Sequence, residues 1–234
     1  MGKVKTRSRA LVLAVGAALV VGIALIGASR LAAEPDAPAK PAPPSAPSPL
    51  LQGIPQSGTV LGRPDAPVTL IEYADLQCPY CAQWALGTLP ELVRDYVREG
   101  TLRIEFRGLA FIGPDSDVAL RAALAAGRQD RLWNVVELLY SNQGAENSGW
   151  ASEELIHRIA SGVPGLDVER LDSDRGLEAL RDQMARAKRQ SQSAGVNGTP
   201  AFELGLTGSR LETLEPTSLG AEEFSAAIDA VLVR

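Results

Sequence analysis

Residues 68–84 read VTLIEYADLQCPYCAQW, and this stretch decides the fold. Its first seven residues are rich in β-branched and aromatic side chains, which favour a strand. Pro79 suits the first turn of a helix, because that position needs no backbone N–H donor. The stretch therefore predicts a strand, a sharp turn and a helix that begins beside Cys78.

The pattern continues with a second helix–strand step. The helix can run from Pro79 to about Arg98, with an interruption near Leu89–Pro90, because proline lacks the N–H that a helix interior needs. Residues 102–107 (LRIEFR) alternate between apolar and polar side chains, which predicts a second strand.

A long helical region follows over residues 115–194. Apolar side chains recur there at spacings of three and four, which marks apolar stripes on helices. Ser152 and Asp174 are the predicted N-caps, and Gly195 is predicted to end the last of these helices.

The end of the chain returns to strands and a final helix. Residues 201–204 and 210–214 predict short strands separated by glycines, and residues 221–232 predict a helix with one apolar face. The expected fold is therefore three-layer α/β, with a helical insertion over about residues 114–194.

Cys78 and Cys81 are the only cysteines, and two residues separate them. At the start of a helix, the first sulfur lies at the positive end of the helix dipole, among N–H groups that have no helical partner. Such a position lowers a thiol pKa from about 8.5 into the range of roughly 3.5–7.5. Cys78 is thus the candidate nucleophile that forms a mixed disulfide, and Cys81 is the candidate resolving cysteine.

Three other interpretations of the cysteine pair are open. A structural disulfide would close so small a loop that it would remove little entropy from the unfolded chain. A zinc site needs further ligands, and His157 is the only histidine, so we expect no metal. The third alternative is an inert, reduced pair. His157 itself is expected on a helix surface.

The N-terminal residues 1–30 have the pattern of a membrane anchor. Residues 10–28 form an uncharged run just long enough to cross a bilayer. Its basic flanks are Lys3, Lys5, Arg7, Arg9 and Arg30. The positive-inside rule then places the N-terminus in the cytoplasm and the catalytic domain outside it, as a single-pass membrane protein. A cleaved signal peptide is the alternative, since Ala28, Ala32 and Ala33 would permit cleavage.

Residues 31–57 are expected to be a linker, because proline, alanine and serine dominate them and cannot form a core. The folded domain is expected over residues 58–234. Beyond Arg30 the chain carries 18 basic and 28 acidic side chains, so it would repel phosphate backbones, and we expect no nucleic-acid partner.

The motif VTLIEYADLQCPYCAQW, followed by GVNGTPAF at residues 195–202, resembles the DsbA-like branch of the thioredoxin superfamily. The similarity extends from about residue 58 to the end and includes RLWNVVELLY at residues 131–140. The resemblance implies a thioredoxin fold split by a helical domain. It also implies that Cys78 is the attacking sulfur, Cys81 the resolving sulfur and Pro200 a cis proline facing them.

Four more residues are candidates for tuning this site. Thr199 has a backbone that can pair with an extended client strand, and Pro79 and Tyr80 lie between the cysteines. Glu72 is a candidate proton relay to Cys81 if it shares a buried face with Val68, Leu70 and Ala74, as the resemblance supports. The alternative is that Glu72 faces solvent. Trp84 is expected in the core, and Asp75 and Gln77 receive no catalytic role.

The expected function is an extracytoplasmic oxidase that donates the Cys78–Cys81 disulfide to exported cysteine-containing client proteins. The resemblance adds a quinone-linked membrane protein as the partner that reoxidises it. No cofactor is expected, and a monomer is favoured. A reductase or isomerase remains open, because the direction depends on the redox potential. A different class of function is a non-catalytic, membrane-tethered adaptor.

Overall fold

The computed structural model describes residues 46–233. The expected membrane anchor over residues 10–28 and most of the expected linker lie outside the described residues. No helix within residues 46–233 is both long enough and apolar enough to cross a membrane.

Within the described residues, the strands form one six-stranded sheet. The strands are β1 (Gln56–Ser57), β2 (Val60–Leu61), β3 (Val68–Asp75), β4 (Leu102–Leu109), β5 (Ala201–Leu206) and β6 (Glu212–Leu214). Their order is β1-β2-β4-β3-β5-β6, with β3 and β4 parallel and the other neighbours antiparallel. Strand β3 is therefore paired on both sides, and every residue in it is buried.

One continuous helical segment connects β3 to β4. It consists of α2 (Pro79–Gln83), η2 (Trp84–Thr88), α3 (Leu89–Leu92) and η3 (Val93–Val97), and both η2 and η3 are π-helical. The expected interruption near Leu89–Pro90 is not a break. The N–H of Leu89 donates to the carbonyl of Trp84, five residues earlier, and this widened turn accommodates a proline that has no N–H.

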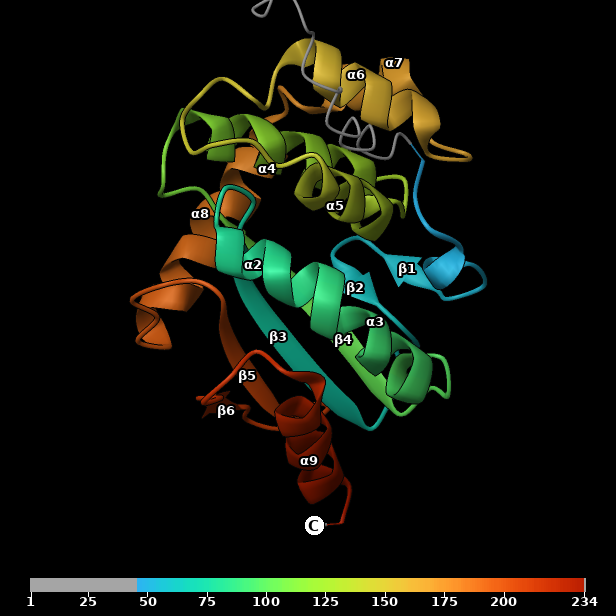
Figure 1. Cartoon of the computed structure of the whole chain (residues 1–234), viewed down its shortest axis with the longest axis vertical. Coiled ribbons are helices and arrows are strands. Elements are labelled where there is room, and N and C mark those ends of the chain that lie inside the picture. The colour runs from blue at the N-terminus through green and yellow to red at the C-terminus, as the bar shows by residue number, and fades with distance from the viewer. Residues whose placement is uncertain (1–45, 234) are drawn as a thin grey trace, which may run out of the picture. The chain divides into compact units, whose positions relative to one another are not determined.

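Five helices lie between β4 and β5, and one follows β6. They are α4 (Pro114–Gly127), α5 (Leu132–Ser141), α6 (Glu153–Gly162), α7 (Val168–Asp174), α8 (Glu178–Ser193) and the C-terminal α9 (Ala221–Leu232). Helices α4 to α7 gather at one end of the sheet, and α2 and α3 cross the sheet diagonally (Figure 1). The architecture is α/β with a helical region inserted between two strands, as the sequence predicts.

The two faces of β3 pack against different helices. Val68, Leu70 and Ala74 belong to the main core, together with Trp84 of the helix that follows. Residues of the opposite face pack against Ala187 of α8. This alternation follows from the two-residue period of a strand and places α8 on the face of the sheet opposite α2.

An aromatic cluster joins the active-site helix to the C-terminal part of the fold. The ring of Trp84 lies 5.1 Å from that of Phe202 on β5 and 5.8 Å from that of Phe224 on α9. The rings of Phe202 and Phe224 are 4.8 Å apart and meet edge to face. All three side chains are fully buried, which confirms the prediction that Trp84 belongs to the core.

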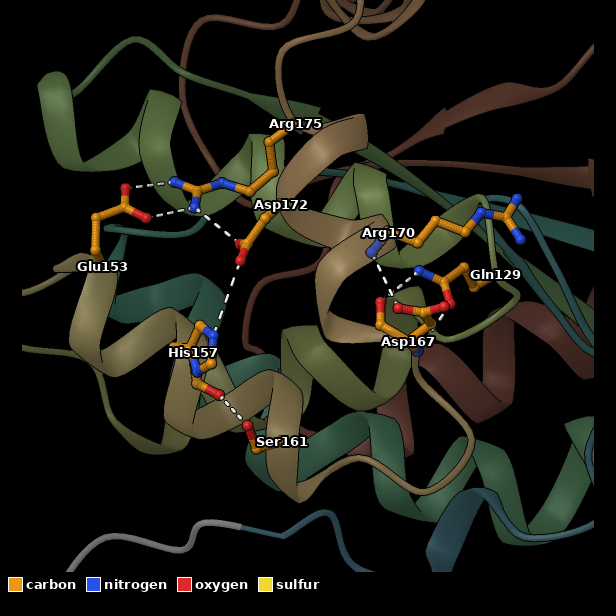
Figure 2. Close-up of polar contacts among 8 residues, drawn as sticks. All are labelled: Gln129, Glu153, His157, Ser161, Asp167, Arg170, Asp172 and Arg175. Carbon is orange, nitrogen blue, oxygen red and sulfur yellow. Dashed lines mark hydrogen bonds and ion pairs between the residues drawn. The ribbon is translucent and has the colours of Figure 1, made fainter.

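One of the two predicted helix caps is right and the other is wrong. Ser152 caps α6 and accepts a hydrogen bond from the N–H of Leu155. Asp174 instead ends α7, and its buried carboxylate pairs with Arg128 at 2.9 Å. The cap that sequence analysis missed is Asp167, which accepts from the N–H of Arg170 (Figure 2).

His157 lies on the exposed surface of α6, as expected. Its Nε2 is 3.9 Å from a carboxylate oxygen of Asp172, and Arg175 pairs with Glu153 in the same group (Figure 2). These contacts connect α6 to α7 and to Arg175, the residue that follows α7. Exposed pairs of this kind stabilise a fold only slightly.

The folded part begins earlier than the predicted boundary at residue 58. A short 3₁₀ helix, η1 (Pro49–Leu51), precedes β1, and both Leu51 and Ile54 are buried in the main core. Arg98 donates hydrogen bonds to the carbonyls of this segment. The proline-rich composition gave no sign of this early start, because it depends on a few apolar side chains, Leu50, Leu51 and Ile54, that pack against the main core.

We expect Phe224→Ala to lower the free energy of unfolding by about 3–5 kcal/mol, because it leaves a cavity beside Trp84 and Phe202. Urea unfolding of the reduced protein measures this loss. Val233→Ala is the control, since that side chain is 85% exposed and its truncation leaves the midpoint unchanged. Equal midpoints for Phe224→Ala and the wild type would contradict the packing role.

Candidate active site

Cys78 occupies the N-cap position of α2. Its N–H donates to the carbonyl of Asp75 at 3.0 Å, and its own carbonyl accepts from the N–H of Ala82 at 3.1 Å. These two bonds make the turn from the end of β3 into the helix. They place the Cys78 sulfur beside the N–H groups of the first helical turn, which have no partner inside the helix.

The surroundings of the Cys78 sulfur favour its thiolate form. Its pKa is lowered to about 6, chiefly by a hydrogen bond from the Cys81 thiol. Burial opposes this effect, while the Thr199 side chain and the N–H groups of Cys81 and Tyr80 add to it. Near neutral pH the side chain is therefore mostly an anion, which is the form that attacks disulfides.

The Cys81 sulfur lies one turn further into the helix and has the opposite character. Cys81 is fully buried, and both cysteines are free thiols. Burial raises the pKa of Cys81 most, and the hydrogen bond to Cys78 and the negative charge of Glu72 raise it further. The two sulfurs are thus unequal, with one poised to react and the other held as a neutral thiol.

The loop before β5 lies against this helix start. The Thr199–Pro200 peptide bond is cis. The Cys78 sulfur lies 3.2 Å from the carbonyl oxygen of Thr199, to which it donates a hydrogen bond when it is protonated. Strand β5 begins directly afterwards, and its Ala201 pairs with Tyr73 of β3. The sheet register therefore brings residues 121 positions apart into contact.

Glu72 lies on β3 beneath the helix that carries both cysteines. Glu72 is fully buried, which excludes the solvent-facing alternative. It lies on the same, core-facing side of β3 as Leu70 and Ala74. Neither carboxylate oxygen has a hydrogen-bond partner among the described residues. Burial, and secondly the negative charge of Cys78, raise the pKa of Glu72 well above its ordinary range. Its carboxyl group is consequently held in the neutral, protonated form.

The two residues between the cysteines face solvent. Pro79 is exposed at the first helical position, and Tyr80 is 63% exposed. Their side chains form the outer surface beside Cys78, where an approaching protein would make contact.

Sequence reasoning missed the role of Asp75, the last residue of β3. Its buried carboxylate accepts hydrogen bonds from the N–H groups of Gln77, Phe111 and Ile112 and from the hydroxyl of Ser116, at 2.6–3.2 Å. It therefore ties the turn before Cys78 to the loop after β4 and to the start of α4. The available signal was the pair of polar residues Asp75 and Gln77 shortly before Cys78, but no local pattern shows their hydrogen-bond partners.

The helical insertion also reaches this turn. Tyr140 of α5 donates to the carbonyl of Asp75 at 3.4 Å, and Gln143 and Asn147 bond to residues 76–78. The turn thus receives donors both from the sheet end and from the inserted helices.

Comparison with known proteins gives matches over most of the chain. Residues 56–230 match the family model described as Thioredoxin. A probable disulfide bond formation protein D from Bacillus cereus is 31% identical over 144 residues, which span 60% of this chain and 67% of the relative. The disulfide bond formation protein D of Bacillus subtilis is 26% identical over 156 residues, which span 66% of this chain and 68% of the relative.

Solved structures share the fold at lower sequence identity. Oxidised BdbD from Bacillus subtilis superposes with a TM-score of 0.65 at 22% identity, covering 81% of this chain and 97% of BdbD. The α-DsbA1 protein of Wolbachia pipientis gives a TM-score of 0.64 at 20% identity, covering 80% of this chain and 92% of that protein.

The raised pKa of Glu72 predicts a pH dependence of stability. Because the folded state prefers the neutral acid, its contribution is complete below the ordinary pKa of 4.5 and is lost as pH rises toward the folded-state pKa. We expect the wild type to lose stability relative to Glu72→Gln above pH 4.5, by at most about 1.4 kcal/mol per pH unit.

Urea unfolding of both reduced proteins between pH 4 and pH 8 measures this difference. Cys78 contributes with the opposite sign because its pKa is lowered, and its contribution is present in both proteins, so the difference between the two curves reports Glu72 together with its interaction with Cys78. Parallel curves would show that Glu72 titrates as an ordinary glutamate.

Proposed function

Because this chain belongs to the thioredoxin family and is a DsbA-like thiol–disulfide oxidoreductase, we propose that it is an oxidase that introduces disulfides into exported proteins. The observation that carries this direction is the lowered pKa of Cys78, about 6, beside the raised pKa of Cys81. A stabilised thiolate favours the reduced enzyme, so the oxidised enzyme readily gives its disulfide away.

Client oxidation then proceeds in two exchanges. A client thiolate attacks the sulfur of Cys78 in the Cys78–Cys81 disulfide, and Cys81 leaves as a thiolate that takes up a proton. A second client thiolate attacks the client sulfur of the mixed disulfide and expels the Cys78 thiolate. The client loses two electrons and gains a disulfide, and the two electrons remain on the reduced cysteine pair.

Glu72 is the proposed source of the proton for Cys81. Its buried carboxyl group is held in the neutral form, and burial also raises the pKa of Cys81, so both groups favour the protonated state. Donating that proton would neutralise the leaving Cys81 thiolate inside a core that disfavours charge. On reoxidation the same carboxylate would take the proton back.

The client would bind where Cys78 meets the loop before β5. The backbone of Thr199, next to Pro200, already accepts from Cys78 and can pair with an extended client strand. Pro79 shapes the first helical turn, and exposed Tyr80 offers an aromatic surface to the client.

The site of action is proposed to be outside the cytoplasm, with the N-terminal run over residues 10–28 as a single membrane anchor. The basic residues before that run support this orientation. A quinone-linked membrane protein is the proposed partner that reoxidises the cysteine pair. Support for this partner comes from the family resemblance alone.

The oxidase role predicts different results for the two cysteine variants. Cys78→Ser abolishes oxidation of a reduced, unfolded client protein, because it removes the sulfur that the client thiolate attacks. Cys81→Ser leaves Cys78 without its internal partner and accumulates mixed disulfides with clients. Client oxidation in a glutathione buffer and non-reducing electrophoresis measure both effects.

Survival of client oxidation in Cys78→Ser would overturn the assignment of Cys78 as the reacting sulfur, and a wild type that oxidises no client would instead support a non-catalytic adaptor. Equilibration with glutathione gives the redox potential, and a potential near −270 mV, as in reducing thioredoxins, would overturn the oxidase direction.

Membrane anchorage makes a separate prediction about topology. Protease added to intact cells should digest the domain that follows residue 58, while the N-terminal peptide stays with the membrane fraction. Mass spectrometry of the purified chain checks whether residues 1–30 are retained. A mature chain that starts near residue 33 would show that the segment is a cleaved signal peptide.

A further inference from the structure

The backbone of the redox turn is held by a side chain from the helical insertion. Gln143 follows α5, and its Nε2 donates to the carbonyl of Leu76 at 2.8 Å and to the carbonyl of Cys78 at 3.2 Å. These carbonyls belong to residues 67 and 65 positions earlier in the chain. A single amide therefore bridges both ends of the turn that delivers Cys78 to the helix start.

Asn147 holds the middle residue of the same turn. Its backbone N–H donates to Oε1 of Gln77 at 2.7 Å, and its Oδ1 accepts from Nε2 of Gln77 at 3.1 Å. Gln77 is 1% exposed, so this paired contact replaces the water that its amide would otherwise bind. The positive φ of Asn147, 55°, is a conformation that asparagine tolerates better than most residues.

We propose that Gln143 and Asn147 are positioning residues for the thiol–disulfide exchange of Cys78, because they fix the turn that presents its sulfur to the first N–H groups of α2. This proposal rests on the oxidoreductase function proposed above. Neither residue has a hydrogen bond to a sulfur among the described contacts, so each acts through the backbone of residues 76–78.

The geometry explains why this turn matters for reactivity. The thiolate of Cys78 depends on donors from Cys81, Tyr80 and Thr199, and each of these hydrogen bonds weakens steeply when its angle changes. The Cys78 carbonyl also accepts the first helical hydrogen bond, from Ala82. Gln143 orients this carbonyl and thereby the start of α2 relative to the sulfur.

The donor also contributes electrostatically. The N–H end of the Gln143 amide points toward the Cys78 carbonyl, so its partial positive charge lies against the backbone of the residue that carries the thiolate. The ionisable groups that act on the sulfur or lie in its turn are Cys81, Glu72, Tyr140 and Asp75. A change at Gln143 leaves all four in place.

The test uses substitutions that keep the shape of the side chain. Gln143→Met has a similar length and no donor, and we expect it to raise the measured thiol pKa of Cys78 by about half to one unit, the effect of one net hydrogen bond. Gln143→Glu places a carboxylate against two carbonyls, and a larger rise is expected. Thiolate absorbance against pH gives the pKa, and the glutathione equilibrium should shift toward the oxidised enzyme in parallel.

Asn147→Gly provides an independent second variant. Glycine keeps the positive φ without strain and removes only the side chain, so the remaining backbone contact to Gln77 is less directional. We expect a rise of the Cys78 pKa in the same direction. This variant also carries the test if Gln143→Met does not fold. The matched control is Gln192→Met on α8, whose exposed side chain makes no hydrogen bond to residues 76–78 among the described contacts and should leave the pKa unchanged.

The outcomes separate this proposal from the proposed function. A lower urea midpoint with an unchanged Cys78 pKa in Gln143→Met and Asn147→Gly would show a merely structural role and overturn the positioning role. A wild-type Cys78 that titrates near 8.5 and oxidises no client would instead overturn the oxidase function. An acidic wild-type thiol that becomes less acidic in both variants supports the inference.

Discussion

The structure depends on one electrostatic arrangement, the placement of the Cys78 sulfur at the N-terminal end of α2. The neighbouring Cys81 thiol is the chief donor that stabilises negative charge there, and the free N–H groups of the helix start add to it. Without that placement the sulfur would be a slow nucleophile and a poor leaving group at neutral pH. The strand before it and the loop of Thr199 bring the helix start and the backbone before β5 together.

The difference between the two sulfurs arises from hydrogen bonding and from burial. Both cysteines are buried, but Cys78 has hydrogen-bond donors around its sulfur, whereas burial most strongly opposes ionisation of Cys81, one turn further into the core. The same burial keeps Glu72 neutral and leaves its oxygens without partners in the described part of the chain. Burying a carboxyl group without hydrogen-bond partners lowers stability. In the proposed mechanism this group lies where it would transfer a proton to the buried sulfur of Cys81.

The inserted helices contribute to the site as well as to the core. A turn between a buried strand and a buried helix hides carbonyls and amides that need partners, since unpaired groups are expensive away from water. Asp75 accepts from the sheet end, and Gln143 donates from the insertion. Hydrogen bonds that satisfy the turn also fix the direction of the sulfur, so stability and reactivity share the same contacts.

The sequence by itself determined the local steps. Side-chain period and the properties of proline and glycine predict three features of the fold. These are the strand over residues 68–75, the helix that starts beside Cys78 and the helical region before residue 195. Sequence reasoning was wrong about the cap at Asp174 and placed the domain start too late.

Only the tertiary structure decided which distant residues meet. The structure joins Thr199 to Cys78 and Gln143 to the redox turn, and these contacts link positions from about 65 to about 120 residues apart. The tertiary structure also decides that Glu72 is buried. Periodicity reports which face of an element is apolar, but it does not report which other element covers that face. That choice depends on sheet register and on the packing of the whole chain.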